Sequence, residues 1–236
     1  MISKRLREIL QKNAEFEKEA PYNFCDRWCE RCSHEKQMRC KIYQDEFEQK
    51  MTCIAHGKEP GDPEITKEVM KRQFEEIGEE LEQFAEEDEI DFDDLNDPEF
   101  EKIRKHIRFV ENNPLQVTAE RYLDKANKFL EKTFYKDTSK KSELVRDFET
   151  VSWYHTLLPV KLNMALAGFH EPACEGDLSL YDAVAQFEIC KKAIRQLIEA
   201  LRKIDKHMPS YHDHVLVLLT LLHNMCSRIE MMEESI

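Results

Sequence analysis

Hydrophobic residues recur along this chain at alternating intervals of three and four positions, which is the period of an α-helix. One such stripe covers residues 2–16 and ends before Pro21, and a second covers 65–84. A helix is also expected at about 99–112, and longer stripes lie at 117–134, 144–165, 183–204 and 215–229. Four long amphipathic patterns in succession predict a helical bundle. The expected fold is all-α, a bundle of about four long helices with an N-terminal, helical, cysteine-rich metal-binding module.

Glycine and proline mark the main boundary in the N-terminal half. The stretch "HGKEPGDPE" (56–64) holds two of the chain's five glycines and two prolines, so it predicts a loop. Asp62 is expected to cap the next helix, with Pro63 at its first position. The predicted domains are the first helix with the four-cysteine module (1–62), an amphipathic helix with an acidic connector (63–98), and the bundle (99–236).

Composition narrows the range of function classes. Five glycines in 236 residues are few, whereas nucleotide-binding turns of α/β enzymes depend on glycine. No Walker or dinucleotide-binding loop occurs. Charged residues make up 35% of the chain, which is typical of solvated helices. Whether the protein is an enzyme stays open at this level.

The net charge of −13 comes from one segment. Residues 75–101 contain 15 acidic residues and no Lys or Arg, while the rest of the chain has 33 acidic and 35 basic residues. Fifteen like charges cannot be buried without partners, so this segment is expected to face solvent and to line no cavity. An acidic interaction surface is the alternative. The acidic balance argues against nucleic-acid binding, which needs clustered Lys and Arg.

Two observations bear on the compartment. The N-terminus "MISKRLREILQKN" lacks the apolar core of a secretory signal. The longest apolar run, "VLVLLTLL" (215–222), is far shorter than the roughly 20 residues that cross a bilayer. A cytoplasmic protein that does not bind membranes is therefore expected, and a protein partner, if there is one, is unknown. Cytoplasmic thiols stay reduced, so clustered cysteines there favour metal binding over disulfides.

The stretch "CDRWCERCSHEKQMRC" places four cysteines within sixteen residues, spaced C-x3-C-x2-C-x7-C. On an unbroken helix Cys25, Cys29 and Cys32 would share one face, so a thiol-lined core stripe is one interpretation. The neighbouring positions are mostly polar, and Cys40 recurs after a predicted break. The sequence therefore favours a metal site whose ligands are Cys25, Cys29, Cys32 and Cys40.

Geometry bears on the identity of the metal. A tetrahedral zinc ion holds its sulfurs only about 3.8 Å apart. Cys25 and Cys32 on a straight helix would be separated by about 10 Å of rise, so zinc requires a helix break, for which Ser33 offers an N-cap. A [4Fe–4S] cluster is larger and accommodates a wider spread. Zinc is the expected metal and [4Fe–4S] the alternative, with His34 and Cys53 as spare ligands.

The C-x3-C-x2-C part of the motif resembles the cysteine triad of radical S-adenosylmethionine enzymes. The resemblance covers only Cys25, Cys29 and Cys32, and it implies a cluster with one open iron. Those enzymes use an α/β barrel, and no strand pattern is present in this chain. Cys40 adds a fourth thiolate, which would close the site.

A second unusual stretch is "WYHTLLP" (153–159). His155 falls on the apolar stripe of its helix, and Pro159 removes the N–H that would bond the His155 carbonyl. The resulting kink predicts a pocket near His155 and Trp153. The alternative is a core histidine that bonds a neighbouring helix.

Three functional hypotheses follow. The leading one is a non-catalytic, metal-binding helical protein with a structural four-cysteine site and a binding or regulatory role. The second is an iron–sulfur protein in electron transfer or redox sensing. The third is an enzyme whose pocket lies near His155.

Overall fold

The computed structural model describes residues 3–87, 98–135, 143–170 and 178–236, without the side chains of 73, 76, 77, 79–87 and 98–100. Throughout these ranges the regular elements are helices and no strand occurs, so the predicted all-α class is confirmed. The α-helices are α1 (Lys4–Glu19), α2 (His34–Arg39), α3 (Lys41–Ala55), α4 (Pro63–Glu87), α5 (Pro98–Glu111), α6 (Pro114–Leu130), α7 (Val145–His170), α8 (Leu178–His207) and α9 (His212–Glu234). Short 3₁₀ turns lie at Pro21–Phe24, Cys29–Arg31 and Pro209–Tyr211, and a π-turn covers Glu131–Tyr135.

The chain divides into two compact units. One unit consists of Met1–Trp28 and Arg104–Ile236, and we call it the bundle unit. The other consists of Cys29–Ile103, and we call it the cysteine unit. Each unit is described by itself below.

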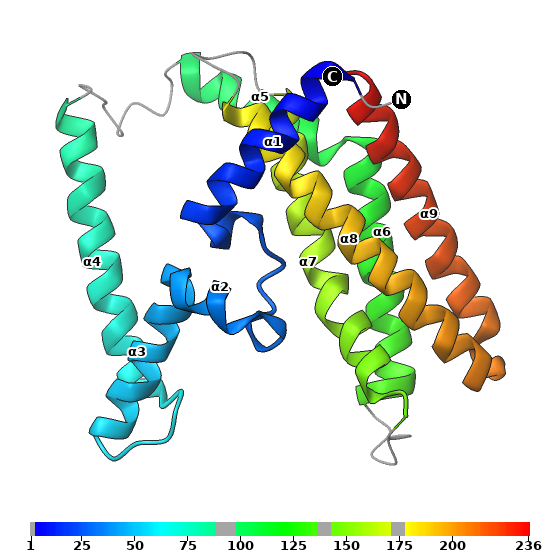
Figure 1. Ribbon diagram of the computed structural model, residues 1–236, viewed down its shortest axis with the longest axis horizontal. Coiled ribbons are helices and arrows are strands. Elements are labelled where there is room, and N and C mark those ends of the chain that lie inside the picture. Colours follow the sequence, from blue (N-terminus) through cyan, green and yellow to red (C-terminus); the bar gives the residue numbers. More distant parts are fainter. Residues whose placement is uncertain (1–2, 88–97, 136–142, 171–177) are drawn as a thin grey trace. The chain divides into compact units, whose positions relative to one another are not determined.

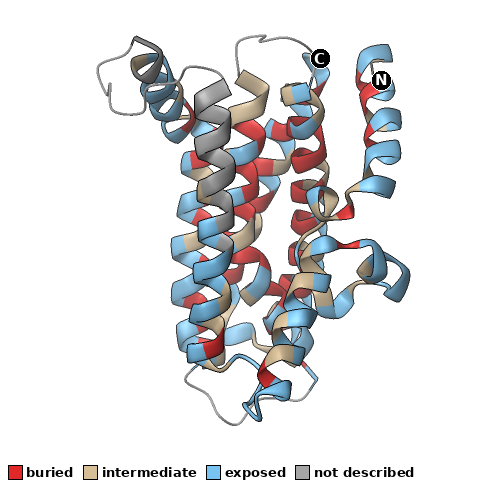
Figure 2. Ribbon diagram, turned by 90° about the vertical axis from the view of Figure 1, so that its left-hand side faces the viewer, coloured by how far each residue is buried: buried red, intermediate tan, exposed pale blue. Residues whose placement is uncertain are grey.

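The bundle unit is built on four long helices, α6 to α9, which lie side by side (Figure 1). Their buried positions face inward (Figure 2), and one apolar core includes Phe129, Leu158, Leu197 and Leu222, one from each helix. Each of these side chains is at most 1% exposed. The apolar stripes seen in the sequence are therefore the faces that the four helices bury against one another.

Helix α1 packs on α8 within the bundle unit. Leu6 and Ile9 form a buried cluster with Val184, and the Asn13 side chain donates a 2.8 Å hydrogen bond to the carbonyl of Tyr181. The sequence assigned this helix to the cysteine module instead. The two divisions differ because an apolar stripe shows that a helix has a buried face but does not show which helix covers it.

The expected helix start at residue 63 is present. Oδ1 of Asp62 accepts the backbone N–H groups of Glu64 at 3.0 Å and Ile65 at 3.4 Å. Helix α4 then begins at Pro63. Capping by Asp and a proline at the first helical position are local signals, which is why the sequence sufficed to predict them.

The cysteine unit buries few apolar side chains. Cys40, Cys53 and Ile65 are buried among its described residues. One hydrogen bond of 3.0 Å, from Gln49 to Thr66, ties α3 to α4. Large apolar side chains on the surface of this unit are Met38, Phe47, Met51, Ile54, Met70, Phe74 and Ile103. A helical unit with so small a core gains little stability from packing alone.

The acidic segment 75–101 falls largely outside the described side chains. Glu75 is exposed and Glu101 is half-buried. The predicted exposure of the remaining acidic residues stays a prediction.

The segment Pro209–Glu234, which contains α9, is long and apolar enough to cross a membrane by length and composition. In the bundle unit its residues Val215, Leu218 and Leu222 are buried in the common core, whereas Leu216 and Val217 are exposed. The cytoplasmic location and the absence of membrane binding remain predictions.

Candidate functional site

The four-cysteine segment is not one continuous helix. Cys25 has extended backbone (φ −123°, ψ 162°), and Arg27 has a left-handed conformation with φ 57°. A 3₁₀ turn starts at Cys29, and Ser33 is the N-cap residue of α2, although its side chain makes no capping hydrogen bond. The shared helical face of the core-packing interpretation is therefore absent. The break that zinc requires between Cys25 and Cys40 is present.

Cys29 and Cys32 stand at the two ends of one tight turn. The N–H of Cys32 donates to the carbonyl of Cys29 at 3.1 Å, and Nε2 of Gln37 donates to the same carbonyl at 2.8 Å. Residues i and i+3 of a 3₁₀ turn lie on the same side. The two thiols therefore project from one side of a turn that Gln37 ties to α2.

Cys40 lies between α2 and α3 and is buried. Its N–H donates to the carbonyl of Gln37 at 3.1 Å, and its own carbonyl accepts the N–H of Gln44 at 3.0 Å. Cys25, Cys29 and Cys32 are partly exposed.

Cys25 belongs to the bundle unit, whereas Cys29, Cys32 and Cys40 belong to the cysteine unit. In the described ranges no three His, Cys, Asp or Glu residues form a group that could hold a metal ion. The described cysteines are free thiols. Four thiolates held about 3.8 Å apart repel one another unless a cation joins them, so ligand closure and metal binding are coupled. The convergence of the four cysteines stays a prediction.

The two spare ligands differ in accessibility. His34 is exposed at the start of α2, whereas Cys53 is fully buried in α3. His34 is therefore free to reach a metal, and Cys53 contributes to the small core of the cysteine unit.

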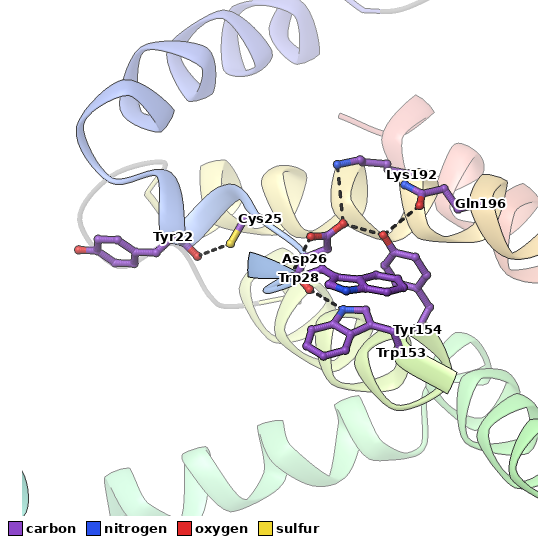
Figure 3. Close-up of polar contacts among 8 residues, drawn as sticks. All are labelled: Tyr22, Cys25, Asp26, Trp28, Trp153, Tyr154, Lys192 and Gln196. Carbon is purple, nitrogen blue, oxygen red and sulfur yellow. Dashed lines mark hydrogen bonds and ion pairs between the residues drawn. The ribbon is translucent and has the colours of Figure 1, made fainter. Parts of the chain in front are cut away.

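Asp26 anchors the segment that carries Cys25 to the bundle (Figure 3). Oδ2 of Asp26 accepts the hydroxyl of Tyr154 at 2.6 Å, and the backbone carbonyl of Asp26 accepts Nε1–H of Trp153 at 2.9 Å. Oδ1 of Asp26 accepts the N–H of Trp28 at 3.2 Å. One acidic residue thereby fixes its own turn and binds two neighbouring side chains of α7.

Aromatic packing and α8 complete this anchor. The ring of Trp28 stacks on that of Trp153 with centroids 5.2 Å apart, and it meets the edge of Tyr154 at 5.7 Å. From α8, Nζ of Lys192 lies 3.7 Å from Asp26, and Gln196 lies 3.2 Å from the Tyr154 hydroxyl. Our sequence reasoning missed this site. The signal was a buried-type aromatic residue, Trp28, in an otherwise polar stretch.

A buried lysine lies in the same region of the bundle unit. Lys161 of α7 is 5% exposed, and in the described part of the chain its ammonium group makes no hydrogen bond or ion pair. Burial lowers its pKa first of all, and the charge of Arg27 lowers it further, whereas Cys25, Cys190 and Asp182 raise it. A buried cation attracts an anionic ligand, a thiolate included.

His155 and Trp153 do not share a face of α7. His155 is 6% exposed, as predicted, and its Nδ1–H donates to the carbonyl of Ser152 at 2.7 Å, within its own helix. Burial lowers the pKa of His155 below its usual value. Residues two apart on a helix do not face each other, and Trp153 is bonded to Asp26 instead. One open groove lies along α4 and another lies next to Asn113 and Met231, and neither is lined by His155 or Trp153. The pocket near His155 stays a prediction.

Comparison with known proteins does not assign this chain to a family or give it a function. No protein family, curated protein or solved structure matches this chain. Function must therefore be inferred from the residues and their geometry.

Proposed function

We propose that Cys25, Cys29, Cys32 and Cys40 bind one zinc ion, and that this site is structural in a non-catalytic protein with a binding or regulatory role. The observation that carries the proposal is the turn that presents Cys29 and Cys32 on one side. Four thiolates fill the tetrahedral coordination of zinc, which leaves no position for a reactive water.

The small core of the cysteine unit supports this proposal. Cys40, Cys53 and Ile65 are its buried apolar residues within the described ranges. Small units with few buried apolar residues commonly depend on a bound metal or disulfides, and the described cysteines form no disulfide. A metal that binds only the folded state would add its binding free energy to the stability of this unit.

The same spacing supports a [4Fe–4S] cluster as the second candidate. A cluster separates its cysteine ligands more widely than a single zinc ion does, so it places weaker demands on the segment. The role would then be electron transfer or redox sensing. Colour distinguishes the two, because an iron–sulfur protein is brown and a zinc protein is colourless.

The deciding experiment is elemental analysis of the full chain purified without oxygen, with zinc, iron and acid-labile sulfide measured per chain. We expect one zinc ion per chain and loss of that zinc in the double variant Cys29→Ser, Cys32→Ser. The matched control is Cys226→Ser, which changes a half-buried thiol of α9 and should keep the metal. A wild-type chain free of both zinc and iron would refute metal binding, and iron with sulfide would assign the cluster instead.

Removal of the metal provides a second test. A strong chelator under reducing conditions should make the segment from Cys29 to Ala55 sensitive to limited proteolysis, because its stability depends on the metal. The helices α6 to α9 should resist cleavage, since their core contains no proposed ligand. Equal protection of the 29–55 segment with and without chelator would contradict a structural role for the metal.

A further inference from the structure

Helix α4 carries a regular apolar stripe that the metal proposal does not use. Met70, Phe74, Ile77, Leu81 and Phe84 are spaced 4, 3, 4 and 3 residues apart, which is the heptad pattern of a helix that packs along a partner helix. The two of them with described side chains are exposed, Met70 by 47% and Phe74 by 67%. Large apolar residues at heptad spacing are rarely left in water unless a partner covers them.

Within the cysteine unit, α3 packs against the first turn of α4. Ile65 is buried there, and Gln49 bonds Thr66 at 3.0 Å. An open groove of about 850 Å³ then runs along the next turns of α4. It is lined by Gly61, Pro63, Thr66, Lys67, Met70, Lys71, Phe74 and Glu75. The groove thus begins at the turn where α3 packs and follows the apolar stripe as far as Phe74 and Glu75.

The charge of α4 is strongly uneven. Its 25 residues contain nine acidic and three basic side chains, and residues 75–87 contain seven acidic residues and no basic one. Of the three bases, Lys71 is already paired with Glu75 at 3.5 Å. The charged residues that line the described groove are Lys67, Lys71 and Glu75. Further along the sequence of α4 every charged residue is acidic, and Glu80 and Glu87 occupy heptad positions next to the apolar stripe, where charge selects the partner.

We propose that α4 is a docking surface for an amphipathic helix of another protein, with an apolar stripe flanked by Lys and Arg. Such helix-in-groove recognition combines apolar anchors with complementary charge. Charge also argues against pairing with α4 of a second copy of this chain, since each α4 would bring nine acidic residues and only three basic ones. Gly78 leaves room for close approach, because a Cβ at this position would have no atom within 4 Å.

The test uses the full-length protein and two synthetic peptides of identical composition. One peptide is a basic amphipathic helix with Leu at the heptad core positions and Lys beside them. The other is scrambled, so that it keeps the charge and loses the apolar stripe. Fluorescence anisotropy of the labelled peptides at physiological salt should show one-to-one binding of the first. The scrambled peptide should bind at least about tenfold more weakly, because charge alone does not fill the groove.

A pair of variants locates the contact on α4. Phe74→Ser should weaken binding of the amphipathic peptide by about tenfold or more, since it removes the most exposed described anchor. Glu68→Ser is the matched control on another face of the same helix, and it should change the affinity by less than about threefold. Far-UV circular dichroism checks that both variants keep the wild-type helix content.

Three outcomes would overturn the proposal. They are no binding of the amphipathic peptide, equal binding of the scrambled peptide, and an affinity that Phe74→Ser leaves unchanged. Analytical ultracentrifugation tests the competing occupant, which is a second copy of this chain. A wild-type dimer that Phe74→Ser dissociates would show that the groove binds that second copy. The metal content of the same samples is measured separately, so failure of the docking surface and failure of the metal site are distinguishable.

Discussion

The anchor at Asp26 leads to the sharpest prediction on stability. Replacing Asp26 with Ala removes the acceptor of the 2.6 Å hydrogen bond from Tyr154, whose ring is 1% exposed. It also removes the bond to the N–H of Trp28 and the ion pair with Lys192. The turn before Cys29 should then be held on α7 mainly by the stacked tryptophans and by the backbone bond to Trp153.

The contacts set the expected size of the effect. A hydrogen bond to a charged acceptor contributes about 1.5–3 kcal/mol, and removing it leaves a buried hydroxyl with a poorer set of partners. The Lys192 side chain is 61% exposed, so its ion pair should contribute less than about 1 kcal/mol. Because Gln196 still lies 3.2 Å from the hydroxyl, the penalty is partly relieved. We expect Asp26→Ala to lower the free energy of unfolding of the bundle unit by about 2 kcal/mol.

The chain is well suited to this measurement, because Trp28 and Trp153 are its two tryptophans and both lie in the anchor. Tryptophan fluorescence in a urea titration therefore reports on this region alone, while far-UV circular dichroism reports on all helices. The fluorescence transition of Asp26→Ala should move to lower urea. In a double-mutant cycle with Tyr154→Phe the two losses should not add, with a coupling of about 1 kcal/mol.

Glu30→Ala serves as the control, since Glu30 is an exposed acidic residue four positions further along the chain. It should change the stability by less than about 0.5 kcal/mol. The reasoning fails if Asp26→Ala leaves the fluorescence transition at the wild-type position. It also fails if the effects of Asp26→Ala and Tyr154→Phe are simply additive.

Three further substitutions test buried polar groups. Tyr122→Phe should raise the free energy of unfolding by about 1 kcal/mol in urea titrations, because its fully buried hydroxyl has no hydrogen-bond partner in the described ranges. Lys161→Met should stabilise the fold at neutral pH by about 1–3 kcal/mol. Burial lowers the pKa of Lys161 below its usual 10.5, so wild-type stability rises with pH from that lowered pKa to 10.5, and this slope should vanish in the variant. His155→Leu should reduce the loss of stability on acidification below pH 6.5, because burial lowers the pKa of His155 and the unfolded chain binds the proton first. A destabilised Tyr122→Phe, or pH profiles that match the wild type in the other two, would contradict these assignments.

The sequence by itself determined where most of the longer helices lie, although no apolar stripe was identified for α3 (Lys41–Ala55). The apolar period marked the stripes that α6 to α9 bury, and the pair Asp62 and Pro63 marked the start of α4. It also located the cysteine cluster and the break at Ser33. These features follow from residues within a few positions of one another, because helix period, capping and turn formation are local interactions.

Only the tertiary structure decided which faces meet. Asn13 bonds Tyr181 across 168 positions of sequence, and Asp26 bonds Tyr154 across 128. Neither contact leaves a mark in the local pattern, because a polar residue that bonds a distant partner resembles one that bonds water. The burial of Lys161 is decided in the same way, since it depends on which side chains close over its helix. Long-range packing is selected by the complementary shapes of whole helix faces, and the sequence of one helix does not identify its partner.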